Sequence, residues 1–119
     1  MSEHLSKIID QNQLVSMMNK TKWRELCSEF EKESTVSPLV KYKLITSDKE
    51  FGLSEVWWHE LYGECQAIEW LDFSKVKSRE NISTQVVAVL DSVGVPYSDE
   101  GGVFRVWGYV NSNSRPSHL

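Results

Sequence analysis

Apolar residues stand on both faces of two neighbouring segments in the middle of the chain, 56–61 and 68–73. Side chains alternate between the two faces of a strand, so a segment that is apolar on both suits the covered interior of a sheet. Tyr62-Gly63-Glu64 lies between the segments, and its glycine can turn the chain at little steric cost. We therefore predict a β-hairpin over Glu55–Phe73 at the centre of the sheet. An amphipathic helix over Glu55–Leu61 is the alternative, and the aromatic and β-branched enrichment argues against it.

Three further segments have the spacing of helices. Ser2–Met18 carries a weak apolar stripe, so we expect a first helix there. Asn19–Thr21 begins a second helix, because short polar side chains cap free backbone N–H groups. One side of that helix carries apolar residues at i, i+3, i+4 and i+7: Trp23, Leu26, Cys27 and Phe30. The strongest pattern predicts a helix over Ile82–Val93, which Gly94 and Pro96 would end.

Two segments alternate between apolar and polar residues, as strands with one wet face do. The first is Leu39–Thr46, and a polar loop over Ser47–Gly52 follows it. The other is Val103–Val110, and a loop over Tyr97–Gly102 precedes it. One face of this last strand would carry Phe104, Val106 and Val110, and the other face Arg105, Trp107 and Tyr109.

The predicted order of elements is helix, helix, strand, strand, strand, helix, strand. We expect an α+β fold with a mostly antiparallel sheet of about four strands and helices packed on one face. Residues 1–110 are expected to form a single α+β domain, and residues 111–119 a polar C-terminal tail without core-forming residues. A chain of 119 residues is one domain by default and can bury a core without disulfides or metal.

Composition narrows the class of protein further. The formal net charge is −4, whereas duplex-binding proteins use a basic face, so we expect no nucleic acid partner. No stretch approaches the roughly 20 apolar residues of a membrane span, and the first residues lack the apolar run of a signal peptide. Cys27 and Cys65 show no zinc-ligand spacing. Free thiols suit a reducing compartment, so we expect a cytoplasmic protein.

One cluster of residues could carry chemistry. His59 lies near Glu60, Glu64 and Glu69 along the chain, and a histidine beside a carboxylate could act as a general base. Cys65 could be a nucleophile with His59 as its base. No second histidine stands at ligand spacing, and no third group orients His59, so structural roles are favoured for both residues. We therefore assign no catalytic residue, no metal ligand and no cofactor.

The loop before the last strand has two further features. Asp99 and Glu100 could hold a cation, but an acidic pair in a turn is more often solvated. Gly101-Gly102 does not form a phosphate-binding loop, because no lysine follows it and a strand, not a helix, comes next.

Three short segments occur in a distinctive order: Asn19-Lys20-Thr21-Lys22-Trp23, then Trp58-His59-Glu60 to Ile68-Glu69-Trp70-Leu71, then Val95-Pro96-Tyr97 to Trp107-Gly108-Tyr109. In this order they resemble a family of short, uncharacterised bacterial proteins, over residues 19–110. That family has no assigned chemistry, so the resemblance implies a bacterial source and lends no catalytic residue. Small acidic bacterial domains of this kind include immunity proteins, which neutralise a toxin by binding it.

Aromatic residues are concentrated in the predicted strands. If the helices cover one sheet face only, some tryptophans remain on the other, and tryptophan, tyrosine and arginine are enriched at binding hot spots. The candidate binding residues are Arg105, Trp107, Tyr109, Trp57, His59 and Glu69. We expect a non-enzymatic protein-binding module, with an immunity-type role against a basic toxin as its most concrete form. The simpler alternative is that Trp107 belongs to the core and Arg105 is a surface ion-pair partner.

Two other functions stay open. A small-molecule binder or small enzyme would use a pocket around His59, Trp58 and Trp70. A homodimer would bury the aromatic face against a second copy of the chain. A closed pocket with His59 at its floor would favour the small-molecule function, and a flat, exposed aromatic sheet face would favour the protein-binding module.

Overall fold

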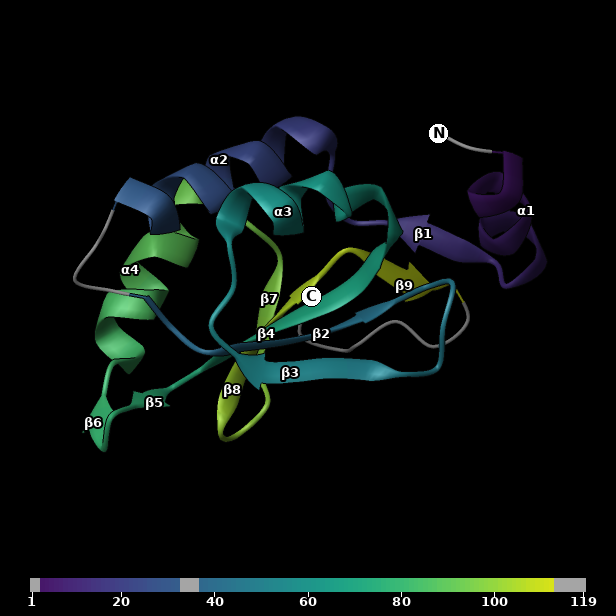
Figure 1. Cartoon of the computed structure of the whole chain (residues 1–119). Coiled ribbons are helices and arrows are strands. Elements are labelled where there is room, and N and C mark those ends of the chain that lie inside the picture. Colours follow the sequence, from purple (N-terminus) through teal and green to yellow (C-terminus); the bar gives the residue numbers. More distant parts are fainter. Residues whose placement is uncertain (1–2, 33–36, 113–119) are drawn as a thin grey trace.

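A computed structural model describes residues 3–32 and 37–112 of the chain. Its main sheet is antiparallel, with strands in the order β3-β2-β4-β8-β7 (Figure 1). These strands are β2 (Val40–Leu44), β3 (Glu50–Ser54), β4 (Ile68–Ser74), β7 (Tyr97–Asp99) and β8 (Val103–Trp107). Three helices cover one face of the sheet: α2 (Lys20–Lys32), α3 (Trp58–Gly63) and α4 (Ser83–Val93). The predicted α+β fold is confirmed, and the main sheet has five strands where about four were expected.

Smaller elements lie around the main sheet. α1 (Glu3–Gln11) leads into β1 (Leu14–Ser16), which pairs with β9 (Tyr109–Asn111). β5 (Val76–Lys77) and β6 (Glu80–Asn81) pair as a short hairpin, and the one-turn helix η1 (Cys65–Ala67) precedes β4. Figure 1 shows α1 apart from the other helices, beside β1. Of the predicted tail, residues 113–119 lie outside the described residues.

β4 is the middle strand of the sheet, as the apolar pattern on both of its faces predicts. Leu71 and Phe73 belong to the core under the helices and are fully buried. Trp70 and Asp72 alternate with them on the opposite face and are only 5% and 1% exposed. β4 pairs with β2 on one side and with β8 on the other. The prediction that this segment lies at the centre of the sheet is confirmed.

The prediction of a strand as the first arm of the hairpin is wrong, because helix α3 lies in this part of the chain. Trp58 and Leu61, three residues apart, are buried, whereas Trp57 and His59 are exposed. This is the spacing of one helix face. The Trp58 ring stacks on Phe30 of α2 with the centroids 5.1 Å apart, so packing against α2 overrides the strand preference of aromatic residues. The amphipathic helix that was the alternative is the closer prediction.

Three further boundaries differ from those predicted. β3 lies partly in the predicted loop Ser47–Gly52, and β7 in the predicted loop Tyr97–Gly102. Both are edge strands, and strands at an edge carry exposed polar residues that resemble a loop in sequence. The first helix ends at Gln11, although we expected it over Ser2–Met18. Gln13 takes a φ of 54°, which ends the helical path, and β1 follows.

The last predicted strand is divided at Gly108 into β8 and β9. The Gly108 N–H donates to the carbonyl of Glu69 at 2.8 Å, which brings the two backbones together. A Cβ atom at this position would lie 2.0 Å from the Ile68 carbonyl oxygen. Only glycine allows so close an approach of the two backbones. The glycine at position 108 therefore explains why β8 and β9 are separated there. Tyr109 lies beyond the break, on β9.

The predicted second and third helices are confirmed as α2 and α4. Asn19 caps α2, since its Oδ1 accepts the N–H of Lys22 at 2.7 Å. The apolar residues predicted for the inner side of α2 are all buried: Trp23, Leu26, Cys27 and Phe30. α4 ends at Gly94, which has a φ of 76° and donates its N–H to the carbonyl of Leu90.

The sheet face without helices is held by an ion pair between β4 and β8. Arg105 donates from Nε to Asp72 Oδ1 at 2.7 Å and from Nη2 to Oδ2 at 3.0 Å. Its guanidinium lies 4.0 Å from the centroid of the Trp70 ring. The two hydrogen bonds to Asp72 raise the pKa of Arg105. Arg105 and Asp72 thus cover the middle of this face, where no helix of the described residues packs.

We expect Arg105→Met to lower the free energy of unfolding by about 3 kcal/mol, because it leaves the Asp72 carboxylate buried without its partner. Urea unfolding followed by tryptophan fluorescence measures this loss.

The double variant Asp72→Leu/Arg105→Met removes both charges and should recover part of the lost stability. A single variant that unfolds within about 0.5 kcal/mol of the wild type would contradict the role given to the ion pair.

Gly108→Ala should lower stability by about 4 kcal/mol or prevent folding, because its Cβ has no room beside the Ile68 carbonyl. Gly102→Ala is the matched control, since nothing lies within 4 Å of a Cβ there. We expect the control to change stability by no more than about 1 kcal/mol. Thermal unfolding followed by circular dichroism compares the two, and equal melting temperatures would mean that β4 and β8 do not approach as described.

Candidate functional site

The structure separates the predicted binding residues into two groups. Trp57 and His59 lie at the start of α3, in the helix layer. The other group lies on the side of the sheet without helices and consists of Arg105 and, around a neighbouring hollow, Glu69, Trp107 and Tyr109. The two groups are therefore considered as separate candidate surfaces.

Trp57 is the most exposed large hydrophobic side chain that the structure describes, with 71% of its surface accessible. It is the N-cap residue of α3, and its side chain makes no capping hydrogen bond. Its carbonyl accepts the N–H groups of Glu60 and Leu61 at 3.0 Å each, and its ring meets that of His59 edge-on at 6.0 Å. Serine, threonine, asparagine or aspartate at an N-cap adds about 1 kcal/mol of stability. Helix formation therefore does not explain a tryptophan at this position.

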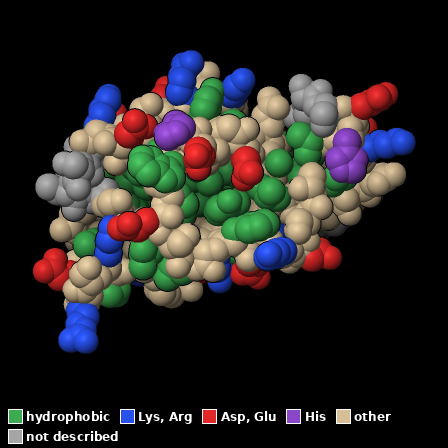
Figure 2. Space-filling model, in the orientation of Figure 1, with side chains coloured by type: hydrophobic (Ala, Val, Ile, Leu, Met, Phe, Trp, Pro, Cys, Tyr) green, Lys and Arg blue, Asp and Glu red, His purple; other side chains and the backbone are tan. Residues whose placement is uncertain are grey.

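Two hollows adjoin Trp57, with volumes of about 210 and 410 Å³. Their apolar lining comes from α2, β2, α3 and the residue before Trp57: Phe30, Tyr42, Val56, Trp58 and Leu61. Figure 2 shows hydrophobic side chains gathered in a band across this face of the molecule, over α3 and the neighbouring strands. The exposed indole thus stands over an apolar floor.

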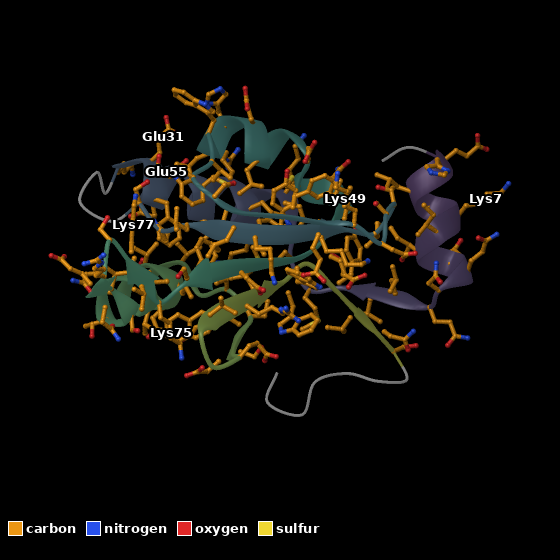
Figure 3. The ribbon with its side chains drawn as sticks, turned by 60° about the horizontal axis from the view of Figure 1, so that its bottom comes forward. Lys7, Glu31, Lys49, Glu55, Lys75 and Lys77 are labelled. Atoms are coloured by element: carbon orange, nitrogen blue, oxygen red, sulfur yellow. The ribbon has the colours of Figure 1, made fainter. Side chains whose placement is uncertain are left out.

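Glutamates from three parts of the chain rim these hollows: Glu31, Glu55, Glu60 and Glu64. Within residues 3–32 and 37–112, Lys77 is the one cation that pairs with any of them, at 2.9 Å from Glu55 (Figure 3). Tyr42 has a raised pKa, first because it is desolvated and then because of the charge of Glu64. Acidic side chains also border the hydrophobic band in Figure 2. Trp57 with these glutamates is named the Trp57 surface, and negative charge dominates it.

The second candidate is a hollow of about 520 Å³ where the open sheet face meets β1 and β9. It is named the Trp107 hollow, and the residues that line it include Leu14, Lys43, Ile45, Asp48, Glu69 and Trp107. Lys43 Nζ lies 3.1 Å from Glu69 Oε1. Trp107 donates from Nε1 to Ser98 Oγ at 2.9 Å, which fixes the orientation of its ring. The hollow therefore combines an aromatic wall with charged groups of both signs.

Tyr109 also lines the Trp107 hollow, but its hydroxyl is used within the protein. It donates to the carbonyl of Gln66 at 2.6 Å, and burial raises the pKa of Tyr109. Arg105 is engaged too, because both of its hydrogen bonds go to Asp72. Trp107 and Glu69 border the hollow as well, and each also has a partner within the protein, Ser98 for the indole N–H and Lys43 for the carboxylate. Binding by any of them stays a prediction.

The proposed pairing of Cys65 with His59 has no support in the geometry. Cys65 is buried and His59 is exposed. Burial raises the pKa of Cys65 above its ordinary value, and it raises the pKa of Cys27 to about 12. A thiol with a raised pKa carries less thiolate at neutral pH, which is the opposite of an activated nucleophile.

The pocket that the alternative function would use, around His59, Trp58 and Trp70, forms only in part. Trp58 and His59 border one hollow beside α3, whereas Trp70 lies on the far face of the sheet under Arg105.

Asp99 and Glu100, the acidic pair between β7 and β8, each bind a different group of the protein. Asp99 accepts from Lys75, which lowers the pKa of Asp99, and Glu100 accepts from the hydroxyl of Ser98. Among the residues that the structure describes, no group of three or more His, Cys, Asp or Glu could hold a metal ion.

Both surfaces belong to a small α+β protein with one antiparallel main sheet and one helix layer. The chain matches DUF6678, a family of unknown function, over residues 5–113, and it belongs to that family. The resemblance to an uncharacterised family is thus confirmed, and the match extends beyond residues 19–110 at both ends. No curated protein and no solved structure matches the chain. In the part of the chain that the structure describes, no helix is long and apolar enough to cross a membrane.

Sequence reasoning missed several residues of both surfaces. Glu31 and Glu60 join the Trp57 surface from two different helices, and Lys43 and Asp48 join the Trp107 hollow from β2 and the loop after it. Glu60 follows Trp57 by three residues, a spacing that marks neighbours only once this segment is read as a helix, and no spacing links Glu31, Lys43 or Asp48 to its tryptophan. The one local signal was Trp57 itself, a tryptophan between a valine and the buried Trp58.

Both thiols should resist modification in the native protein. We expect slow reaction of Cys27 and Cys65 with a disulfide reagent near pH 7, because burial raises both pKa values, and fast reaction of both in urea. Absorbance of the released thiolate follows the reaction. Fast modification of Cys65 in the folded protein would contradict this expectation and support a nucleophilic role for Cys65. The variant Cys65→Ser identifies which of the two thiols reacted.

Proposed function

We propose that this protein is a protein-binding module of the bacterial cytoplasm that captures a basic partner at the Trp57 surface and catalyses no reaction. The observation that carries the proposal is the position of Trp57, whose indole is 71% exposed within a rim of glutamates. An immunity-type role, in which the module neutralises a basic toxin by binding it, is the most concrete form of this function.

The exposed indole supports binding because a partner that covers it removes a large apolar area from water. Each Å² of apolar area contributes about 25 cal/mol, and tryptophan is among the residues enriched at binding hot spots. The adjoining hollows give the partner an apolar floor beside the ring. Trp57 is also held in place by the hydrogen bonds of its carbonyl to α3, so its backbone loses little freedom on binding.

The glutamates support a partner that is rich in lysine or arginine. Charges of opposite sign around an apolar centre speed the encounter of two proteins and exclude partners of like charge. Salt screens such charges, so capture should slow as ionic strength rises. The net charge of −4 acts in the same direction at long range.

The strand face with Arg105, Trp107 and Tyr109 was the first surface predicted for a partner. All three of these residues donate side-chain hydrogen bonds within the protein: Arg105 to Asp72, Trp107 to Ser98 and Tyr109 to the carbonyl of Gln66. A partner would have to compete with those hydrogen bonds. The Trp57 surface requires no such exchange, and we therefore place the partner there.

Trp57→Ser should weaken partner binding by about 30-fold or more while the fold survives, since a hot-spot tryptophan contributes about 2 kcal/mol or more. Serine can cap α3, so the free energy of unfolding should stay equal or rise by up to about 1 kcal/mol. The partner is isolated with the wild-type protein from a lysate of the source organism, purified, and titrated by calorimetry against both proteins.

Val76→Ser is the matched control, because it removes another exposed apolar side chain, on β5. It should leave binding unchanged. Glu31→Gln and Glu60→Gln should slow association at low salt and change dissociation little. A partner that binds Trp57→Ser as tightly as the wild type, or that carries no basic surface, would refute the proposal.

A further inference from the structure

The Trp107 hollow is separate from the Trp57 surface and has the features of a small-molecule site. We propose that it binds a small organic cation, an amine with an apolar body. Its volume of about 520 Å³ lies within the range of ligand pockets, which is about 300–1,000 Å³. This inference does not depend on the partner proposed at the Trp57 surface.

The charges of the hollow favour a cation. Lys43 and Glu69 lie 3.1 Å apart and neutralise each other. Asp48 lines the same hollow, and its carboxylate has no ion pair or side-chain hydrogen bond among the residues that the structure describes. One negative charge is therefore left without a partner. An ammonium group would satisfy it, whereas an anionic ligand would meet two carboxylates and only one lysine.

The aromatic and apolar lining favours a ligand with an apolar body. Trp107, Leu14 and Ile45 supply this part of the wall. The ring of Trp107 already attracts one cation, because the Arg105 guanidinium carbon lies 5.5 Å from its centroid. The hydrogen bond to Ser98 holds the indole in a fixed orientation before any ligand arrives.

A bare metal ion is a poorer occupant. No group of three metal-ligating side chains gathers at the hollow within the described ranges, and divalent cations such as Ca²⁺ take six or more oxygen ligands. An organic cation needs fewer polar contacts, because burial of its apolar part adds to the attraction between the charges.

The test uses three probes of one shape and three charges: benzylamine, benzyl alcohol and benzoate. Each is titrated into the full chain while NMR follows the indole N–H signals, which report on the tryptophan side chains individually. We expect saturable binding of benzylamine at millimolar concentrations, about tenfold weaker binding of the alcohol, and no binding of benzoate. The shifted indole signal should be the one that is absent from Trp107→Phe.

Variants separate this site from a general effect of charge. Asp48→Asn should weaken benzylamine binding by about tenfold without changing the melting temperature, because Asp48 is exposed. Glu80→Gln removes one negative charge on β6, away from the hollow, and should leave binding unchanged. Trp57→Ser should also bind benzylamine as the wild type does.

Equal binding of the three probes, preference for benzoate, or no benzylamine binding up to about 20 mM would overturn the proposal. So would benzylamine binding that Trp57→Ser abolishes and Asp48→Asn retains, since the cation would then occupy the other surface. Loss of the basic partner in Trp57→Ser, with benzylamine binding kept, distinguishes the two sites.

Discussion

The ion pair between Arg105 and Asp72 is the interaction on which the sheet depends. β4 is buried on both faces, yet the helices cover only one of them. On the other face a carboxylate lies at the centre of the sheet, and without a partner it would cost several kcal/mol. Arg105 offsets that cost with two hydrogen bonds and at the same time covers the Trp70 ring. The pair also fixes register, because Asp72 lies opposite Arg105 in the β4–β8 ladder.

This arrangement bears on where a partner is proposed to bind. Two of the N–H groups of Arg105 hold the Asp72 carboxylate, which fixes the guanidinium against the sheet and leaves fewer donors for a partner. In the middle of the open sheet face the side chains are fixed by one another, and the two hollows with aromatic walls lie toward two margins of the molecule. At one margin Trp57 stands beside apolar hollows with a negative rim. At the other, Trp107 borders a hollow in which Asp48 has no partner among the described residues.

The sequence predicted those elements whose apolar residues are the ones that the fold buries. β4 was found because its apolar residues on both faces are buried, and α4 because Gly94 ends a regular apolar face. β3 and β7 were missed since edge strands stay polar, and the break at Gly108 depends on the distant Ile68 carbonyl. The Trp107 hollow could not be read locally, because Lys43, Asp48 and Trp107 meet only after the strands pair. The resemblance to an uncharacterised family came from the order of short segments, and the family match over residues 5–113 confirms it.

The error over residues 55–61 has a physical cause that bears on function. The strand prediction counted Trp57 as a residue that folding must bury, and with that assumption the segment is apolar on two faces. The structure leaves Trp57 exposed at an N-cap where a small polar residue would serve α3 better. A position where local rules fail, with no gain to the fold, is where functional residues are expected. The exposed position of Trp57 is therefore the observation that most supports the binding proposed at this surface.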